Sequence, residues 1–351
     1  MRTFIVTLSL ISLGASIHTG RACAEPDTDR IRAAVAQGLR IVQAAAENYP
    51  SHRDCFSCHH QTLPMLAMEL SGRKGFDVDR KLLQEQAEFT WKSFEKRREI
   101  AAQGKGVGGG SMTVGYGLWA LDIAKWKKDS TTTALVSYLL KTQAEDGSWK
   151  RSSNRPPLEE SDITCTILAV YYMGKFASDD QQPDVDEATK RARAWILGSE
   201  PESHEDRVSR LGALALLKAD RTELAKAQEE IFESQQDNGG WSQLPEMSSD
   251  AYATGLTLFT MQRTGISVND AKFERGVRFL LDSQCDDGSW FVKSRSKPIQ
   301  RFFDNGDPHG KDQFISIPAT SWATAALALT LPPTEAERAE RVPVPAKEPS
   351  R

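Results

Sequence analysis

The sequence predicts an all-α repeat protein built from about six pairs of an outer and an inner helix. Three near-identical segments carry this prediction: 143–149 (QAEDGSW), 235–241 (QQDNGGW) and 284–290 (QCDDGSW). Each segment follows one helical stretch and precedes another. Repetition at a regular spacing indicates stacked supersecondary units. Between the segments, amphipathic stretches alternate with stretches that are apolar nearly all round, as expected for outer helices packed on buried inner ones.

The pattern of apolar residues assigns each helix in order. Stretch 269–283 places Phe273, Val277 and Leu280 on one helical face, whereas 250–264 is apolar on nearly every face. Outer helices are predicted at 29–48, 79–99, 129–142, 185–198, 222–234 and 269–283. Inner helices are predicted at 60–71, 112–125, 162–176, 207–218, 250–264 and 319–330. About twenty extra residues, 293–317, precede the last inner helix, and they predict a long loop.

The repeated segments predict structural staples between helices. Their glycine suits the left-handed turn that ends a helix. The glutamine amide can satisfy backbone groups at a neighbouring helix end, and the tryptophan ring can form an apolar cap. We therefore expect these residues to hold the scaffold together and to do no chemistry.

These Q-x-x-x-G-x-W segments, joined to alternating outer and inner helices, resemble the squalene-hopene cyclase and protein prenyltransferase superfamily. The resemblance covers nearly all of residues 30–330. It implies one α/α toroid whose inner helices line a central apolar cavity, and hence a terpenoid-like or polyprenyl-like apolar ligand. Seven inner-helix aromatics can line such a cavity or form ordinary core: Tyr116, Trp119, Tyr171, Tyr172, Tyr252, Phe259 and Trp322.

The resemblance also directs attention to two aspartates. Cyclases of this superfamily protonate an alkene with the middle aspartate of a D-x-D-D-T pattern, which requires a raised carboxyl pKa. Asp162 and Asp250 match the end of that pattern, but the middle position is Ser161 or Ser249. We expect Asp162 and Asp250 to be helix N-terminal caps, with a catalytic carboxylate in the cavity as the alternative. Cys165 has the wrong spacing from Asp162 for the zinc ligands of prenyltransferases.

The segment CFSCHH (55–60) carries most of the candidate chemistry. It contains C-x-x-C-H, the attachment signature of c-type haem. Two thiols on one helical turn can bond to two neighbouring porphyrin vinyl groups, and His59 can then coordinate the iron. Cys55 and Cys58 can alternatively form a disulfide or a redox dithiol, or bind zinc together with His59 and His60. Haem c is therefore the expected cofactor, with zinc or none as alternatives.

The positions of these residues predict one site. CFSCHH immediately precedes the first inner helix, and Asp162 and Asp250 begin later ones. In a toroid, inner-helix starts gather at one end of the cavity. The inserted loop, which contains His309, leads into the last inner helix and should lie there too, as a lid or binding loop. We expect the haem or metal, the carboxylates and His309 to meet at the cavity mouth.

The two termini predict export and a disordered tail. Arg2, an apolar run and a small-residue site ending at Ala24 form a secretory signal over 1–24. Its removal leaves 42 of the 44 basic residues and all 48 acidic ones, a net charge of 42 − 48 = −6. The toroid would occupy 25–331, in the periplasm or outside the cell. Residues 332–351, rich in Pro, Glu, Arg and Ala, are expected to be disordered.

Function at this stage is a choice among three classes. The first is an exported protein that binds an apolar ligand, carries haem or metal, and works with a redox partner. The second is a cyclase-like isomerase or lyase with Asp162 or Asp250 as the acid. The third is a non-catalytic interaction domain with a Cys55–Cys58 disulfide. Dispersed basic residues predict no nucleic-acid partner, and the apolar run of the signal is too short for a membrane span.

Overall fold

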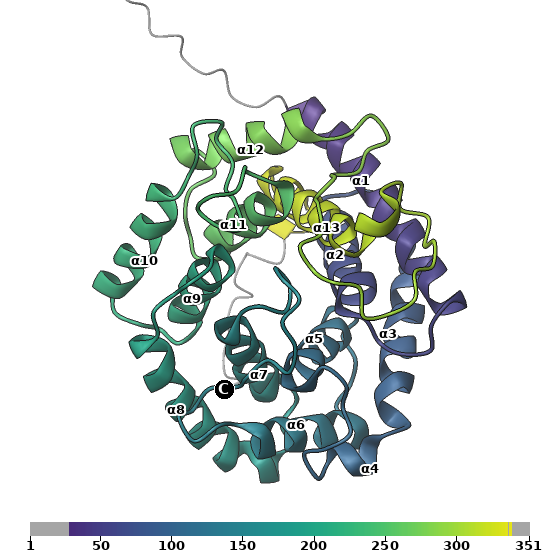
Figure 1. Ribbon diagram of the computed structural model, residues 1–351, viewed down its shortest axis with the longest axis vertical. Helices are drawn as coiled ribbons and strands as arrows, with labels where there is room; N and C mark the ends of the chain where they lie inside the picture. Colours follow the sequence, from purple (N-terminus) through teal and green to yellow (C-terminus); the bar gives the residue numbers. More distant parts are fainter. Residues whose placement is uncertain (1–27, 336, 339–351) are drawn as a thin grey trace, which may run out of the picture.

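Two concentric rings of helices make up the structure (Figure 1). A computed structural model describes residues 28–335, 337 and 338, so the predicted signal peptide and most of the predicted tail lie outside the described residues. The outer ring contains α1 (Thr28–Asn48), α3 (Arg80–Glu95), α6 (Ser130–Thr142), α8 (Gln182–Gly198), α10 (Arg221–Glu233) and α12 (Ala271–Ser283). The inner ring contains α2 (Leu63–Arg73), α5 (Gly110–Ile123), α7 (Asp162–Phe176), α9 (His204–Leu216), α11 (Ala251–Arg263) and α13 (Gln313–Thr330). The prediction of an all-α toroid with six helix pairs is confirmed.

Most helix boundaries differ from the predictions by one to three residues, and three places differ in kind or by more. Outer stretch 79–99 divides into α3 and the short α4 (Arg98–Ala101). A single wide helical turn, Cys58–Thr62, precedes α2. The last inner helix begins at Gln313, six residues before its predicted start, and includes Pro318. Proline in a helix removes one backbone hydrogen bond, and this helix tolerates that loss inside a buried inner ring.

The three repeated segments form the same hydrogen bonds in each copy. Each glutamine side-chain amide donates to a carbonyl of the next outer helix: Gln143 to Ala188 (2.8 Å), Gln235 to Lys272 (2.7 Å) and Gln284 to Ala34 (3.0 Å). Each tryptophan is fully buried, and its indole N–H donates to a carbonyl in the preceding outer helix: Trp149 to Leu139, Trp241 to Ile231 and Trp290 to Leu280, all at 2.8 Å. The segments are staples, as predicted. Each glutamine amide also donates to the glycine carbonyl of its own turn.

The last staple closes the ring. Gln284 belongs to the segment after α12, yet its acceptor Ala34 lies in α1, at the other end of the described chain. Arg30 adds an ion pair to Asp282 (2.7 Å), and α1 packs on α13. The first and last helix pairs are therefore joined by the same kind of bond that joins α6 to α8 and α10 to α12.

Aromatic rings from four inner helices meet in the middle of the toroid. Trp119 of α5 lies 5.9 Å from Tyr116, 6.1 Å from Tyr172 of α7 and 6.0 Å from Trp322 of α13, between ring centroids. Phe259 of α11 lies 5.1 Å from Trp322. These rings pack against one another at distances typical of aromatic cores. The sequence did not decide whether the seven inner-helix aromatics line a cavity or form core. Most of them contact one another in the structure.

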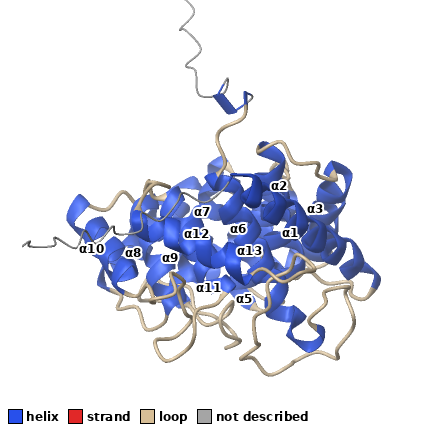
Figure 2. Ribbon diagram, turned by 90° about the horizontal axis from the view of Figure 1, so that it is seen from above, coloured by secondary structure: helices blue, strands red, loops and turns tan. Residues whose placement is uncertain are grey.

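The long loops gather at one end of the rings (lower side of Figure 2). They are the segments that lead into α7, α11 and α13. Near the chain terminus, Glu337 pairs with Lys74 (3.0 Å) and Thr334 donates to the carbonyl of Arg73 (3.2 Å), so residues at the start of the predicted tail contact the end of α2. None of the helices in the described part of the chain combines the length and the apolar character needed to span a bilayer.

Candidate functional site

A cavity of about 360 Å³ opens at the loop end of the toroid. Its walls come from two segments far apart in sequence. One is 56–60, within CFSCHH, and the other is the inserted loop with the start of α13, residues 294, 296–303 and 311–314. Arg155 and Glu159 complete one side. The structure thus brings the C-x-x-C-H-H segment and the inserted loop together at one cavity.

Aromatic rings form much of the cavity wall. Phe314 packs edge-on against His59, with 4.4 Å between ring centroids. Phe303 lies 5.9 Å from His60 and 5.8 Å from Tyr49. Phe56 and Phe302 also line the cavity, and Phe302 is 51% exposed at its rim. The lining therefore combines aromatic and aliphatic side chains with charged ones, among them Arg301, Lys311 and Asp312.

The two histidines of CFSCHH are buried and neutral. His60 stacks on Tyr49 (4.4 Å), and its Nδ1 lies 3.1 Å from Ser57 Oγ, while its Nε2 is buried with no hydrogen-bond partner. Burial lowers the pKa of His60 to about 3 and holds that of His59 well below its usual value. Burial also raises the pKa of the Cys58 thiol. At neutral pH this wall therefore presents imidazoles and a thiol without charge.

One ion pair lies beside these neutral groups. Arg155 donates from Nε to Glu159 Oε2 (2.9 Å) and from Nη2 to Glu159 Oε1, and its guanidinium lies 5.1 Å over the Phe314 ring. Ser153 also donates to Glu159. The pair supplies a fixed polar group that could orient the polar end of a bound molecule.

The thiols of CFSCHH do not have the arrangement that haem attachment was expected to use. Ser57 is extended (φ −139°, ψ 120°), and helical structure begins only at Cys58. Cys55 is exposed and lies 3.8 Å from the Tyr49 hydroxyl, whereas Cys58 is buried with its sulfur 3.4 Å from His59 Nδ1. The two thiols are therefore not on one helical turn, and the residues as placed do not fit a doubly attached haem. Both are free thiols in the structure.

The aspartates and His309 lie outside the lining of this cavity. Asp250 is the N-cap of α11, accepting the N–H of Ala253 (2.9 Å), as predicted. The prediction for Asp162 was wrong, because Ser161 caps α7 by accepting the N–H of Thr164 (2.9 Å). Asp162 instead pairs with Arg151 (3.1 Å).

His309 has partners away from the cavity. Its Nε2 lies 2.7 Å from Ser289 Oγ, in the third staple segment. Cys285 and Asp287 lie beside it. Contrary to the prediction, His309 and CFSCHH do not form one site among the described residues.

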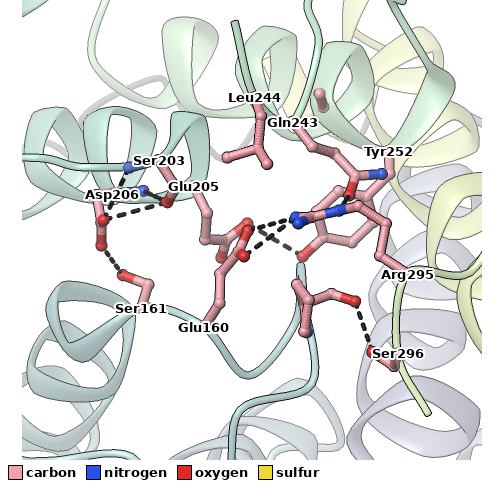
Figure 3. A network of polar contacts seen from close by, with 12 residues as sticks. Glu160, Ser161, Ser203, Glu205, Asp206, Gln243, Leu244, Tyr252, Arg295 and Ser296 are labelled. Atoms are coloured by element: carbon pink, nitrogen blue, oxygen red, sulfur yellow. Dashed lines mark hydrogen bonds and ion pairs between the residues drawn. The ribbon is translucent and has the colours of Figure 1, made fainter. Parts of the chain in front are cut away.

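A buried polar network, which the sequence analysis missed, lies at the same end (Figure 3). Glu205 of α9 accepts hydrogen bonds from the hydroxyls of Thr164 (3.0 Å) and Tyr252 (3.1 Å). Burial raises the pKa of Glu205 to about 8, so this side chain is mostly a neutral acid at pH 7. The only sequence signal was the polar run His204-Glu205-Asp206 just before the predicted inner helix 207–218, and α9 (His204–Leu216) includes that run.

The inserted loop is fixed to this network by Arg295. Its guanidinium donates to both oxygens of Glu160 (2.9 and 3.0 Å) and to the side-chain carbonyl of Gln243 (2.7 Å). Gln243 in turn donates to Asp250 (2.9 Å), whose pKa burial raises to about 6. Figure 3 shows the Arg295 side chain pointing toward Glu160, with both bonds drawn. The loop that covers the cavity is therefore anchored to the starts of two inner helices.

Comparisons with known proteins agree on the fold. No protein-family model and no curated protein matches the chain. Among solved structures, the type II terpene cyclase MstE from Scytonema matches with a TM-score of 0.53 and 11% identity, over 87% of this chain and 99% of that one. MstE has also been solved with geranylgeranyl dihydroxybenzoate as substrate (TM-score 0.55, 10% identity, the same coverage). A possible GH105 member from Salmonella enterica matches with a TM-score of 0.55 and 11% identity, over 86% and 94%. At these identities the likeness shows the fold alone: an α/α toroid like that of a terpene cyclase.

Proposed function

We propose that this protein binds an apolar, terpenoid-like small molecule in the cavity at the loop end of the toroid. The observation that carries the proposal is the cavity itself, about 360 Å³ in volume and walled by Phe56, Phe302, Phe303 and Phe314. That volume lies within the usual range for small-molecule sites. The related fold of MstE, solved with a geranylgeranyl compound, supports the choice of ligand class.

The part of the wall formed by residues 57–60 carries no charge and favours the same ligand class. Buried neutral His59 and His60 can face an apolar group without the desolvation cost of a charge. The Arg155–Glu159 pair would contact a polar end group, and the aromatic rings would contact the hydrocarbon. The proposed ligand is therefore amphipathic, with one polar end.

A titration with geranylgeranyl dihydroxybenzoate tests the proposal, using calorimetry on the full mature chain. The matched pair is Phe302→Ala and Phe291→Ala, because both rings are about half exposed (51% and 49%) but only Phe302 lines the cavity. Loss of the Phe302 contact should weaken binding about tenfold, and Phe291→Ala should bind like the wild type. Equal effects in the two variants, or no binding by the wild type, would refute the proposal.

Acid-initiated isomerase or lyase chemistry is a second candidate, and Glu205 is the observation that favours it. Its neutral carboxyl near pH 7 is the form that such chemistry requires, and Asp250 lies in the same network. The gap beside Glu205, Gln243 and Tyr252 leaves no room for a water molecule, so the Arg295 anchor would have to open to admit a substrate. Turnover of a polyprenyl substrate by the wild type, with loss in Glu205→Gln and retention of ligand binding, would establish it.

Export and a redox partner remain proposals from the sequence, and haem c is a proposal that would require Cys55 and Cys58 to leave the positions described above. Export predicts that the mature protein begins at Glu25, which N-terminal sequencing of secreted protein would test. Covalent haem predicts a Soret band that survives acid-acetone extraction and disappears in Cys58→Ser. A colourless protein from haem-competent cells would exclude haem and leave the cavity proposal intact.

A further inference from the structure

We infer that Cys285, Asp287 and His309 form a Zn²⁺ site at the seam between the inserted loop and the third staple. One sulfur, one carboxylate oxygen and one ring nitrogen of these residues all lie within 4.8 Å of one another. Among the residues that the structure describes, this is the one such group of three histidine, cysteine or acidic side chains. It lies apart from the cavity, whose lining includes none of the three.

Rigid and irregular parts of the chain each contribute to the cluster. Cys285 and Asp287 follow α12 in the third staple, whose backbone is fixed by its own turn and by bonds to α1. His309 comes from the end of the inserted loop and is held by Ser289 Oγ (2.7 Å) and by packing of its ring near Phe291 (5.1 Å). The fold thus brings His309, which lies 20 residues beyond Ser289, to the turn that holds Cys285 and Asp287.

The first staple shows which hydrogen bonds of the third staple belong to the turn and which residues are particular to the proposed Zn²⁺ site. Asp287 accepts from Ser289 N (2.9 Å) and Oγ (2.5 Å), as Asp146 does from Ser148 N (2.9 Å) and Oγ (2.6 Å). Those bonds therefore belong to the turn itself, and in the second staple only the backbone one is present, from Gly240 N to Asn238 (3.1 Å). The other positions differ, because Ala144 stands where Cys285 does, and Lys150 stands where Phe291 does. Lys150 pairs with Asp146 at 3.0 Å in the first staple. The third staple lacks that lysine and has a thiol and an imidazole instead.

A buried, unpaired carboxylate oxygen lies next to the cluster. Asp307 is 4% exposed; its Oδ1 accepts the His309 N–H (2.9 Å), while its Oδ2 has no hydrogen-bond partner. A buried carboxylate oxygen without a partner is costly. A divalent cation held by the neighbouring donors supplies the missing positive charge.

The donor set selects the ion. A thiolate, an imidazole and a carboxylate together suit Zn²⁺ in tetrahedral geometry, and neither Mg²⁺ nor Ca²⁺ favours the sulfur. Asp287 is exposed and Cys285 and His309 are partly exposed, so water can occupy a fourth position. The ion would tie the loop to the ring just before Lys311–Phe314, which line the cavity.

Co²⁺ as a spectroscopic probe tests the site on the full mature chain. Wild-type protein should take up one equivalent and show a thiolate-to-cobalt charge-transfer band. Cys285→Ala recreates the alanine of the first staple and should fold normally while losing the band; His309→Gln should raise the Kd for Zn²⁺ at least about tenfold. Cys58→Ser is the matched control, since it removes the thiol of the other Cys–His segment and should leave the band unchanged.

Three results would overturn the inference. They are the absence of a band in the wild type, a band that survives in Cys285→Ala, and a band lost only in Cys58→Ser, which would place the metal at CFSCHH. Circular dichroism of each metal-free variant checks folding. A second measurement covers variants that fold poorly: Zn²⁺ should raise the Tm of the wild type and of Cys58→Ser, and should raise that of His309→Gln by less at the same Zn²⁺ concentration.

Discussion

At the residue scale, the buried acids define the chemistry that the molecule can support. Glu205 is enclosed by α7, α9 and α11, with two hydroxyls donating to its carboxyl. Desolvation outweighs those hydrogen bonds and raises its pKa to about 8. The folded protein therefore holds a proton on Glu205 that the unfolded chain releases near pH 4.5. This proton links the stability of the ring to pH.

Glu205→Gln should remove a pH dependence of stability. Because the folded-state pKa is raised, the wild type binds more protons than the unfolded chain between about pH 5 and 8, so its unfolding free energy falls as pH rises through that window. Asp250, with its pKa raised to about 6, acts in the same direction below pH 6. Urea unfolding at pH 5 and at pH 9 measures this dependence. Between these two pH values, the unfolding free energy should fall by roughly 2–4 kcal/mol more in the wild type than in Glu205→Gln. Parallel profiles for the two proteins would contradict this assignment.

The sequence identified some site residues and missed others for a physical reason. Cys58 and His59 were predicted because C-x-x-C-H is a local pattern, and local patterns are visible in a sequence. Glu205 and Arg295 act through partners that are distant in the chain: Arg295 meets Glu160 only after the ring has formed. Their roles depend on burial and on that pairing, and neither follows from the residues next to them.

At the element scale, the staples determine how consecutive helix pairs stack. Gly288 has φ +94°, and a Cβ there would lie 2.6 Å from the Cβ of Gln37 in α1. Gly147 and Gly239 are placed alike, with a Cβ 2.6 Å from the carbonyl oxygens of Arg191 and Arg275. Glycine is therefore required twice over at these positions, for its backbone conformation and for the close approach of the next outer helix.

Gly288→Ala should destabilise the ring more than a matched substitution. Gly75 also has a positive φ (+84°), but a Cβ there would have no atom within 4 Å. Gly75→Ala should cost about 1 kcal/mol from backbone strain alone, and Gly288→Ala about 2–4 kcal/mol, because Gln37 and α1 must also move. Denaturant unfolding measures both changes. Equal losses of unfolding free energy in the two variants would mean that α1 can move away from the staple without destabilising the ring.

The helices were predictable from the sequence because their signals are local and periodic. Stretch 162–176 was predicted with the bounds that α7 has, since a serine and an aspartate mark its start. The last inner helix was predicted too short: its first residues, 313–318, follow an irregular loop and include a proline. Their helical state depends on packing against the neighbouring inner helices.

At the scale of the whole molecule, the inserted loop joins parts of the chain that are far apart. Arg295 bonds to Glu160, 135 residues away, and Ser296 donates to the carbonyl of Pro156 (2.8 Å). Together with the wall formed by Phe302 and Phe303, these contacts make the loop both a cover and a lining of the cavity. Access to the site therefore depends on how firmly this loop is held.

Arg295→Met should loosen the loop without unfolding the ring. The ion pair with Glu160 is mostly buried, whereas the nearby pair of Lys293 with Asp312 has a lysine that is largely exposed. Limited proteolysis should cut 293–312 several-fold faster in Arg295→Met than in the wild type, with Lys293→Met as the matched control at the wild-type rate. A large fall in Tm in Arg295→Met would instead show that the pair supports the whole ring.

The central claim is that the ligand site lies under the inserted loop, at the end of the toroid, and not among the aromatic rings at its centre. Photolabelling with a polyprenyl diazirine, followed by peptide mass spectrometry, tests this most directly. Labels on the peptides that contain residues 56–60 and 296–303, reduced by excess unlabelled geranylgeranyl compound, are the predicted result. Specific labels on Trp119 or Trp322 instead would contradict the claim.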